Sequence, residues 1–113
     1  MKRGEVWTVS GGAGYAGKPR PAVVVQDDHF DATASVTICG FTTDPTDAPF
    51  FRILIESSEE NGIRSDGRLM VDKLTTVSKE KMGVKVGRLS DEDVVRLNRA
   101  MMVFLGLAGS PAI

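Results

Sequence analysis

The chain has 113 residues, 42% of them hydrophobic, a size that suits one compact domain with its own core. Its 14 lysines and arginines are balanced by 15 aspartates and glutamates, so a basic overall footprint is excluded and a polyanion site must be a local patch. The single Cys39 excludes an intrachain disulfide, and no run of roughly 20 apolar residues could span a membrane. The start "MKRGEVW" has no apolar signal core, so we expect a cytoplasmic protein.

Short runs of strand-forming residues, separated by polar or glycine-rich stretches, predict about six antiparallel strands. In chain order, they are expected at residues 4–10, 21–26, 35–43, 50–56, 68–78 and 84–90. A glycine-rich loop at residues 11–17 separates the first two strands, and polar loops occupy residues 44–49 and 57–67.

A C-terminal helix is predicted by a change of pattern after the last strand. Ser90 is the expected N-cap, Asp93 follows three positions later as in a capping box, and apolar residues then recur at helical spacing. Residues 100–105 are apolar on all sides, which predicts burial against a partner chain, and Gly106 and Gly109 end the helix. We therefore expect a mainly β domain over residues 1–109, a small SH3-like half-open barrel with a C-terminal helix, and a flexible tail at residues 110–113.

Arg20 stands between two prolines at the start of the second predicted strand, in "GKPRPAVVVQDD". Pro21 favours an extended backbone at Arg20, and the two prolines stiffen the stem that presents the side chain. A guanidinium stays charged at any cellular pH and binds phosphate through two parallel hydrogen bonds. Arg20 is therefore a candidate phosphate-binding residue, and the alternative is an ordinary surface arginine at a strand start.

Thr42 and Thr43 lie where the third predicted strand gives way to a loop. Their hydroxyl groups are placed to donate to a phosphate oxygen, although threonine also occurs there because it favours strands. Asp72 lies in the middle of the fifth predicted strand, where it would share a face with Arg68 and Met70. An aspartate there is unusual, and it indicates either a structural salt bridge or a functional carboxylate.

A metal or nucleotide cofactor is not expected. His29 is the only histidine, and the acids around it, Asp27, Asp28 and Asp31, belong to no HxH, CxxC or HExxH motif. The glycines of residues 11–17 are not followed by Lys-Ser/Thr, nor by a predicted helix, so they do not form a phosphate loop.

Taken in order, several segments resemble the MazF/PemK/Kid family of toxin endoribonucleases from type II toxin-antitoxin systems. They are "KRGEVWTVS", "RPAVVVQDD", "TICGFTT", "GIRSDGRLMVDKLTTVSK" and "VGRLSDEDVVRLNRAMMVFLGL", which together cover nearly the whole chain. The resemblance implies the CcdB/MazF-like fold and a homodimer. It also implies cleavage of single-stranded RNA without a metal, and silencing by a cognate antitoxin.

The resemblance also assigns roles to single residues. Arg20 and Thr42 fall on catalytic positions, Asp72 falls on the acid proposed as a base in the Kid branch, and Lys73 replaces a glutamine that contacts RNA. The chain departs from the family in two places. The loop before Arg20 lacks the Ser-Glu-Gln of many relatives, and Met70 stands where the Kid branch has an arginine, with Arg68 on the same predicted face.

These residues fit a reaction in which the 2′-hydroxyl of RNA attacks the adjacent phosphorus. Arg20 would stabilise the phosphorane, Thr42 would hold a non-bridging oxygen, and Asp72 would take the proton once burial raised its pKa. The remaining residues expected to contact RNA are Tyr15, Lys18, Asp27, Thr43, Arg64, Arg68 and Lys73.

Two other functions are compatible with the same pattern. One is a gyrase-poisoning toxin of the CcdB type, which depends on a Trp-Gly-Ile end, whereas this chain ends in "GSPAI". The other is a small barrel that binds RNA or protein without catalysis, which the missing loop acid and Met70 would allow.

Overall fold

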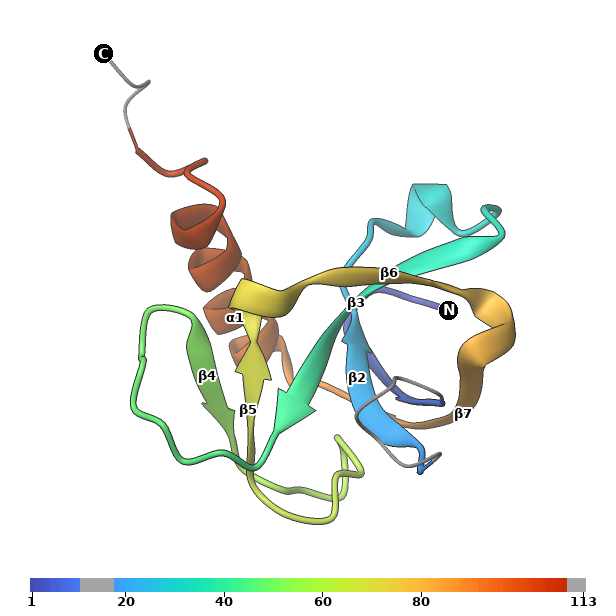
Figure 1. The fold of residues 1–113 in the computed structure, drawn as a ribbon, viewed down its shortest axis with the longest axis horizontal. Helices are drawn as coiled ribbons and strands as arrows, with labels where there is room; N and C mark the ends of the chain where they lie inside the picture. The colour runs from blue at the N-terminus through green and yellow to red at the C-terminus, as the bar shows by residue number, and fades with distance from the viewer. Residues whose placement is uncertain (11–17, 110–113) are drawn as a thin grey trace.

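The computed structural model describes residues 1–10 and 18–109, and these form seven strands and one α-helix (Figure 1). The strands are β1 (Glu5–Val9), β2 (Arg20–Val24), β3 (Ser35–Thr42), β4 (Arg52–Ile55), β5 (Gly67–Met70), β6 (Thr75–Ser78) and β7 (Met82–Arg88). The helix α1 is Asp91–Phe104, and three short 3-10 helices are η1 (Asp28–Phe30), η2 (Val71–Lys73) and η3 (Lys79–Lys81). The predicted mainly β class with a C-terminal helix is confirmed. The predicted loop at 11–17 and tail at 110–113 lie outside the described residues.

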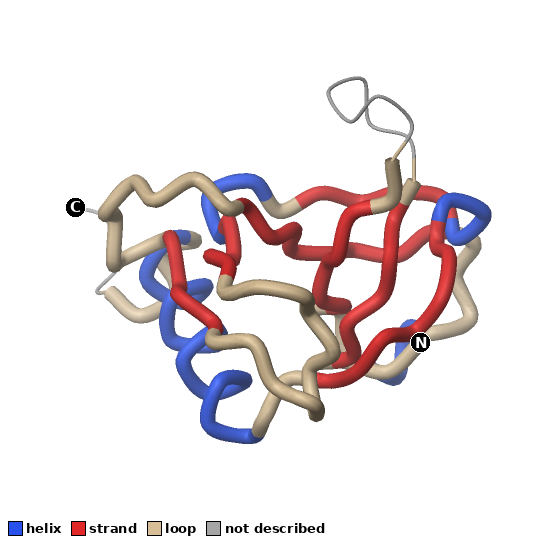
Figure 2. Tube along the Cα trace, turned by 90° about the horizontal axis from the view of Figure 1, so that it is seen from below, coloured by secondary structure: helices blue, strands red, loops and turns tan. Residues whose placement is uncertain are grey.

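Strand β3 is the centre of the sheet. All pairings are antiparallel, and the order is β4-β5-β3-β2-β1-β7, with β6 also paired to β3. Along one edge β3 pairs with β2, and along its other edge it pairs first with β6 and then with β5. The backbone N–H and C=O groups of β3 therefore pair with three different strands. The sheet bends around β3 (Figures 1 and 2).

The single strand predicted at residues 68–78 is wrong, because η2 divides this segment into β5 and β6. Phe41 of β3 faces Leu69, whereas Ile38, three residues earlier, faces Thr75, six residues later. The three surplus residues form the η2 turn, whose Val71 is fully buried and donates its N–H to the Phe51 carbonyl at 2.9 Å. The alternation of side chains expected through Asp72 is lost at this turn.

The two faces of the sheet bury separate hydrophobic clusters. One cluster lies between the sheet and α1 and includes Val23, Leu69, Val71 and Leu97. The other lies on the opposite face of β2 and β3, where alternate residues of the same strands contribute Ala22, Val24, Val36 and Ile38. Because both faces of β2 are buried, its sequence is the continuous apolar run that predicted it.

The predicted start and end of α1 are confirmed. The Ser90 hydroxyl accepts a hydrogen bond from the Asp93 N–H at 3.1 Å, and Gly106 follows the helix with a φ of +75°. The last turn of the helix and the residues after it leave apolar side chains uncovered in the single chain, Met102, Val103, Phe104, Leu105 and Leu107. None of the described helices is long and apolar enough to cross a membrane.

Candidate functional site

A groove of about 260 Å³ opens where β2 begins, beside β3 and the two turns η2 and η3. Its apolar lining comes from β1, β2, β3, β5 and β6 and includes Ala22, Ile38, Phe41 and Met70. Its polar lining consists of Ser10, Arg20, Lys73, Thr75 and Lys81. Three cations therefore converge on the groove, and its described lining contains no carboxylate, although the chain as a whole has a formal net charge of −1.

Arg20 is the first residue of β2 and is exposed. It pairs with Val9 across the β1–β2 ladder, and Pro21, the next residue, also lines the groove. Ala22 faces Gly40 in the β2–β3 register. Arg20 lies two residues before Ala22, and Thr42 lies two residues after Gly40. The two residues are therefore at neighbouring strand ends, and by alternation they belong to the same face.

Lys73 and Lys81 reach the groove from the two turns that flank β6. Lys73 ends η2, Lys81 ends η3, and both side chains are exposed. The Lys81 carbonyl accepts from the Ser10 N–H at 2.9 Å and from the Ser10 hydroxyl at 3.2 Å, which fixes η3 against the end of β1. Lys73 was among the predicted RNA-binding residues. Lys81, Ser10 and Thr75 were not, because their meeting depends on the strand order.

Thr42 ends β3 as predicted, at the point where the strand gives way to a loop. Its hydroxyl accepts the Asp44 N–H at 3.1 Å, and its cross-strand partner on β5 is Arg68. The pKa of the Asp44 carboxyl is lowered, first by hydrogen bonds from Thr46 and further by the charges of Arg52 and Arg68. Thr42 and Arg68 thus form the last pair between β3 and β5, and neither is among the residues that line the groove.

Asp72 is held by Arg52 in a two-pronged ion pair. Arg52 Nε lies 2.8 Å from Asp72 Oδ1 and Arg52 Nη2 lies 3.0 Å from Oδ2, with both side chains largely covered. The hydrogen bonds from Arg52 lower the pKa of the Asp72 carboxyl, so the expectation of a raised pKa is wrong. The sequence indicated either a structural salt bridge or a functional carboxylate at Asp72, and the structure shows the salt bridge. The buried Cys39 thiol has its pKa raised to about 12 by burial and then by the charge of Asp72.

The other predicted residues are spread over the molecule. Asp27 caps η1 and bonds His29, whose backbone N–H is the main reason that the pKa of the Asp27 carboxyl is lowered. Asp27 is seven residues beyond Arg20 and three residues past the end of β2, roughly 20 Å away for an extended chain. Lys18, Thr43 and Arg64 are exposed in loops, and Tyr15 lies outside the described residues. Within residues 1–10 and 18–109, no three His, Cys, Asp or Glu side chains are grouped to hold a metal ion.

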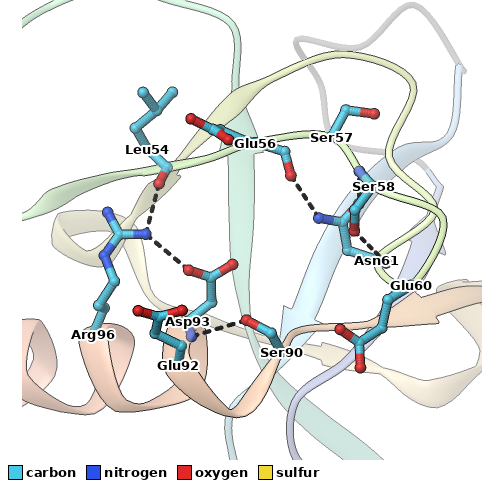
Figure 3. A pocket seen from close by; sticks show the side chains of 10 residues that line it. All are labelled: Leu54, Glu56, Ser57, Ser58, Glu60, Asn61, Ser90, Glu92, Asp93 and Arg96. Atoms are coloured by element: carbon cyan, nitrogen blue, oxygen red, sulfur yellow. Dashed lines mark hydrogen bonds and ion pairs between the residues drawn. The ribbon is translucent and has the colours of Figure 1, made fainter.

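A second concave region, of about 560 Å³, has the opposite charge. It lies between the loop after β4 and the first turns of α1, and four of its lining side chains are carboxylates, Glu56, Glu60, Glu92 and Asp93 (Figure 3). Its one lining cation, Arg96, is already bonded to the Asp93 carboxylate and to the Leu54 carbonyl, each at 2.9 Å. A phosphate backbone would be repelled here, so the groove at Arg20 is the better polyanion site.

Comparison with known proteins identifies the family of the chain. The model of the family described as "PemK-like, MazF-like toxin of type II toxin-antitoxin system" matches residues 2–105. The chain belongs to this family. A PemK/MazF relative from Mycolicibacterium smegmatis, named probable endoribonuclease MazF, is 50% identical over 96% of this chain and 100% of its own length. Endoribonuclease MazF9 of Mycobacterium tuberculosis is 28% identical over 95% and 98%.

Solved structures show the same fold. A structure described as an endoribonuclease in complex with its cognate antitoxin from a mycobacterial species covers 97% of this chain and 99% of its own, with a TM-score of 0.80 at 22% identity. The Mycobacterium tuberculosis toxin MazF-mt6 gives a TM-score of 0.75 at 15% identity, covering 89% and 96%. The predicted MazF-like fold is confirmed by this similarity.

Proposed function

We propose that this PemK/MazF-family toxin is an endoribonuclease that cleaves single-stranded RNA in the cytoplasm without a metal ion. The observation that carries the proposal is the groove at the start of β2, where Arg20, Lys73 and Lys81 converge with no carboxylate in the described lining. Such a groove attracts a phosphate backbone locally, even though the chain has no excess of positive charge. The names of the relatives, which are endoribonucleases, support the same activity.

The proposed reaction uses the RNA's own nucleophile. The 2′-oxygen loses its proton and attacks the adjacent phosphorus, the bond to the 5′-oxygen breaks, and that oxygen takes up a proton. The products are a 2′,3′-cyclic phosphate and a 5′-hydroxyl. Arg20 stabilises the additional negative charge of the phosphorane through its fork of N–H donors, and Thr42, at the neighbouring strand end, holds a non-bridging oxygen.

The RNA chain extends from the groove over neighbouring polar side chains that are exposed or half-buried. Lys18 lies two residues before Arg20, and Lys73 and Lys81 lie in the groove itself. Thr43, Arg64 and Arg68 extend the path along the β3–β5 edge and the loop before it. This arrangement leaves the acidic region near α1 outside the path of the RNA.

The proposed partners are a cognate antitoxin and a second copy of the chain. The apolar side chains at the end of α1, Met102 to Leu105 and Leu107, are each at least 46% exposed in the single chain. A homodimer that uses this end of the helix would remove them from water. An antitoxin segment bound across the dimer would then compete with RNA.

Incubation of the purified protein with one long RNA tests the function directly. We expect cleavage that survives EDTA, products with a 2′,3′-cyclic phosphate and a 5′-hydroxyl, and no cut where the preceding sugar is 2′-deoxy. Activity that is lost in EDTA and restored by magnesium would contradict the mechanism. RNA binding without cleavage would instead favour the non-catalytic barrel.

A further inference from the structure

The ion pair between Arg52 and Asp72 connects two parts of the molecule that the proposed function keeps apart. Arg52 begins β4, at the end of the sheet, whereas Asp72 lies in the η2 turn whose last residue, Lys73, lines the groove. The Arg52 side chain is 12% exposed and that of Asp72 21%, so solvent screens their interaction less than it screens a surface pair. Both carboxylate oxygens accept a hydrogen bond from the guanidinium, at 2.8 and 3.0 Å.

A general base needs a free oxygen lone pair directed at the proton that it removes, and a pKa near the working pH. The Asp72 carboxylate lacks the second property, and Arg52 already occupies one of the two lone pairs on each of its oxygens. Those hydrogen bonds lower the pKa of the carboxyl. Asp72 is also absent from the residues that line the groove, whereas its neighbour Lys73 is among them.

The η2 turn is attached to the residues around the start of β4 by two consecutive interactions. Val71 donates its N–H to the Phe51 carbonyl at 2.9 Å, and Asp72 then receives the two hydrogen bonds from Arg52. The turn consists of the three surplus residues between the pairings of β5 and β6 with β3. Neither ladder fixes those residues, so the direction in which Lys73 leaves the turn depends on these attachments.

We infer that Arg52 and Asp72 are positioning residues, which hold the η2 turn so that Lys73 stays in the groove beside Arg20. This inference rests on the proposed function for its RNA substrate. It assigns Asp72 no proton transfer, and it gives Arg52, which the sequence pattern did not single out, a role in RNA binding that it exerts through Lys73.

Arg52→Lys is the decisive variant, because it keeps the charge and leaves the Asp72 carboxylate intact while removing the planar fork. Affinity is measured on an RNA with a 2′-deoxy sugar at the cut site, and the rate at saturation on the cleavable RNA. We expect Arg52→Lys, Asp72→Asn and Lys73→Ala to weaken RNA binding by a similar factor, roughly 10-fold, as for loss of one charged hydrogen bond. In the Lys73→Ala background the other two changes should add little, because all three disturb one contact.

The saturated rate and its pH profile separate positioning from catalysis. Positioning predicts that Asp72→Asn keeps the shape of the wild-type profile and loses less than about 10-fold in rate. A general base predicts a loss of about 100-fold or more with unchanged affinity, and an altered acidic limb, and that result would overturn the inference. The charge-exchanged variant Arg52→Asp/Asp72→Arg should recover part of the lost affinity, which no base could do.

A measurement without RNA distinguishes failure of this inference from failure of the proposed function. Amide hydrogen exchange at residues 71–74 should be faster in Arg52→Lys than in the wild type. Asp93→Asn, which removes an arginine–carboxylate pair remote from the groove, should leave these amides unchanged. Unchanged exchange in Arg52→Lys would overturn the positioning role, whereas a wild-type protein that cleaves no RNA would overturn the proposed function alone.

Discussion

Gly62 lies directly against the carbonyl group of Val86, and a Cβ atom at position 62 would stand 2.0 Å from that oxygen. The φ of Gly62 is +71°, a region that L-residues with side chains seldom adopt. Next to Val86, a Cβ at Gly87 would likewise stand 2.3 Å from the Glu60 carbonyl oxygen. The loop after β4 and strand β7 therefore pack backbone against backbone, with no room for side chains.

Alanine substitutions at three glycines distinguish the effect of steric conflict on stability from that of backbone strain. Gly62→Ala combines a positive φ with a clash and should lower the free energy of unfolding by about 3 kcal/mol or more. Gly106→Ala has a positive φ but open space around it, so about 1 kcal/mol is expected. Gly109→Ala has neither and should stay within about 0.5 kcal/mol. Urea unfolding of the three variants checks the order, and equal effects at Gly62 and Gly106 would contradict it.

Arg20→Ala should reduce the cleavage rate by about 100-fold or more, because a donor to the phosphorane is removed. Its melting temperature should hardly change, since Arg20 is exposed. Arg20→Lys keeps the charge but loses the fork, so it should retain most RNA affinity and lose most of the rate. Thr42→Ala should show the same separation more weakly. Full activity in Arg20→Ala would remove the basis of the proposed mechanism.

Lys81 should contribute to RNA affinity through charge. A lysine that neutralises one phosphate of a single strand adds about 0.7 to the magnitude of the slope of log K against log salt concentration. Lys81→Ala should therefore reduce that magnitude by about 0.7. The measurement is a titration of the protein with RNA at salt concentrations between about 50 and 200 mM. Lys2→Ala, a change at an exposed lysine outside the groove, is the control and should leave the slope unchanged.

Glu5 should make stability fall in acid. Burial raises the pKa of its carboxyl, but hydrogen bonds from the Lys2 N–H, the Trp7 indole and Lys85 outweigh it and lower that pKa from 4.5 to about 2. A lowered pKa stabilises the fold above about pH 4.5, and this contribution, up to about 3 kcal/mol, is lost as the pH falls towards about 2.

The comparison of wild type with Glu5→Gln isolates this effect. The free energy of unfolding of the variant should depend less on pH between about 4.5 and 2 than that of the wild type. Glu59→Gln, at an exposed glutamate, should follow the wild type across the same range. Parallel curves for wild type and Glu5→Gln would show that the Glu5 contacts contribute nothing.

Val103 should lie in the dimer interface. Its side chain is 55% exposed in the single chain, and a carboxylate there would be buried without a partner on association. Val103→Asp should weaken self-association by at least about 30-fold, or about 2 kcal/mol. Phe30→Asp, at a residue 62% exposed on η1, is the matched control and should have no effect. Sedimentation of the wild type as a monomer at micromolar concentration would contradict the interface.

The strands and the helix could be predicted because their signals are local: apolar runs, turn residues and the Ser90 cap. The interruption at η2 could not, because Leu69 and Val71 continue an alternating pattern and only their pairing with β3 shows the three surplus residues. Similarly, Arg20 has a local signal in its flanking prolines. Lys81 has none, since it reaches the groove only through the order of the strands.

The place of β3 between three partners has a consequence for the newly made chain on the ribosome. β3 is complete at Thr42, but the strands that cover its second edge end only at Met70 and Ser78. At about 5–20 residues per second, synthesis of that stretch takes roughly two to seven seconds. During this interval the nascent chain carries an uncovered strand edge, the kind of edge that pairs with other chains. Lys73 is made within the same interval and Lys81 just after it, so the nascent chain is prone to aggregate before its groove is complete.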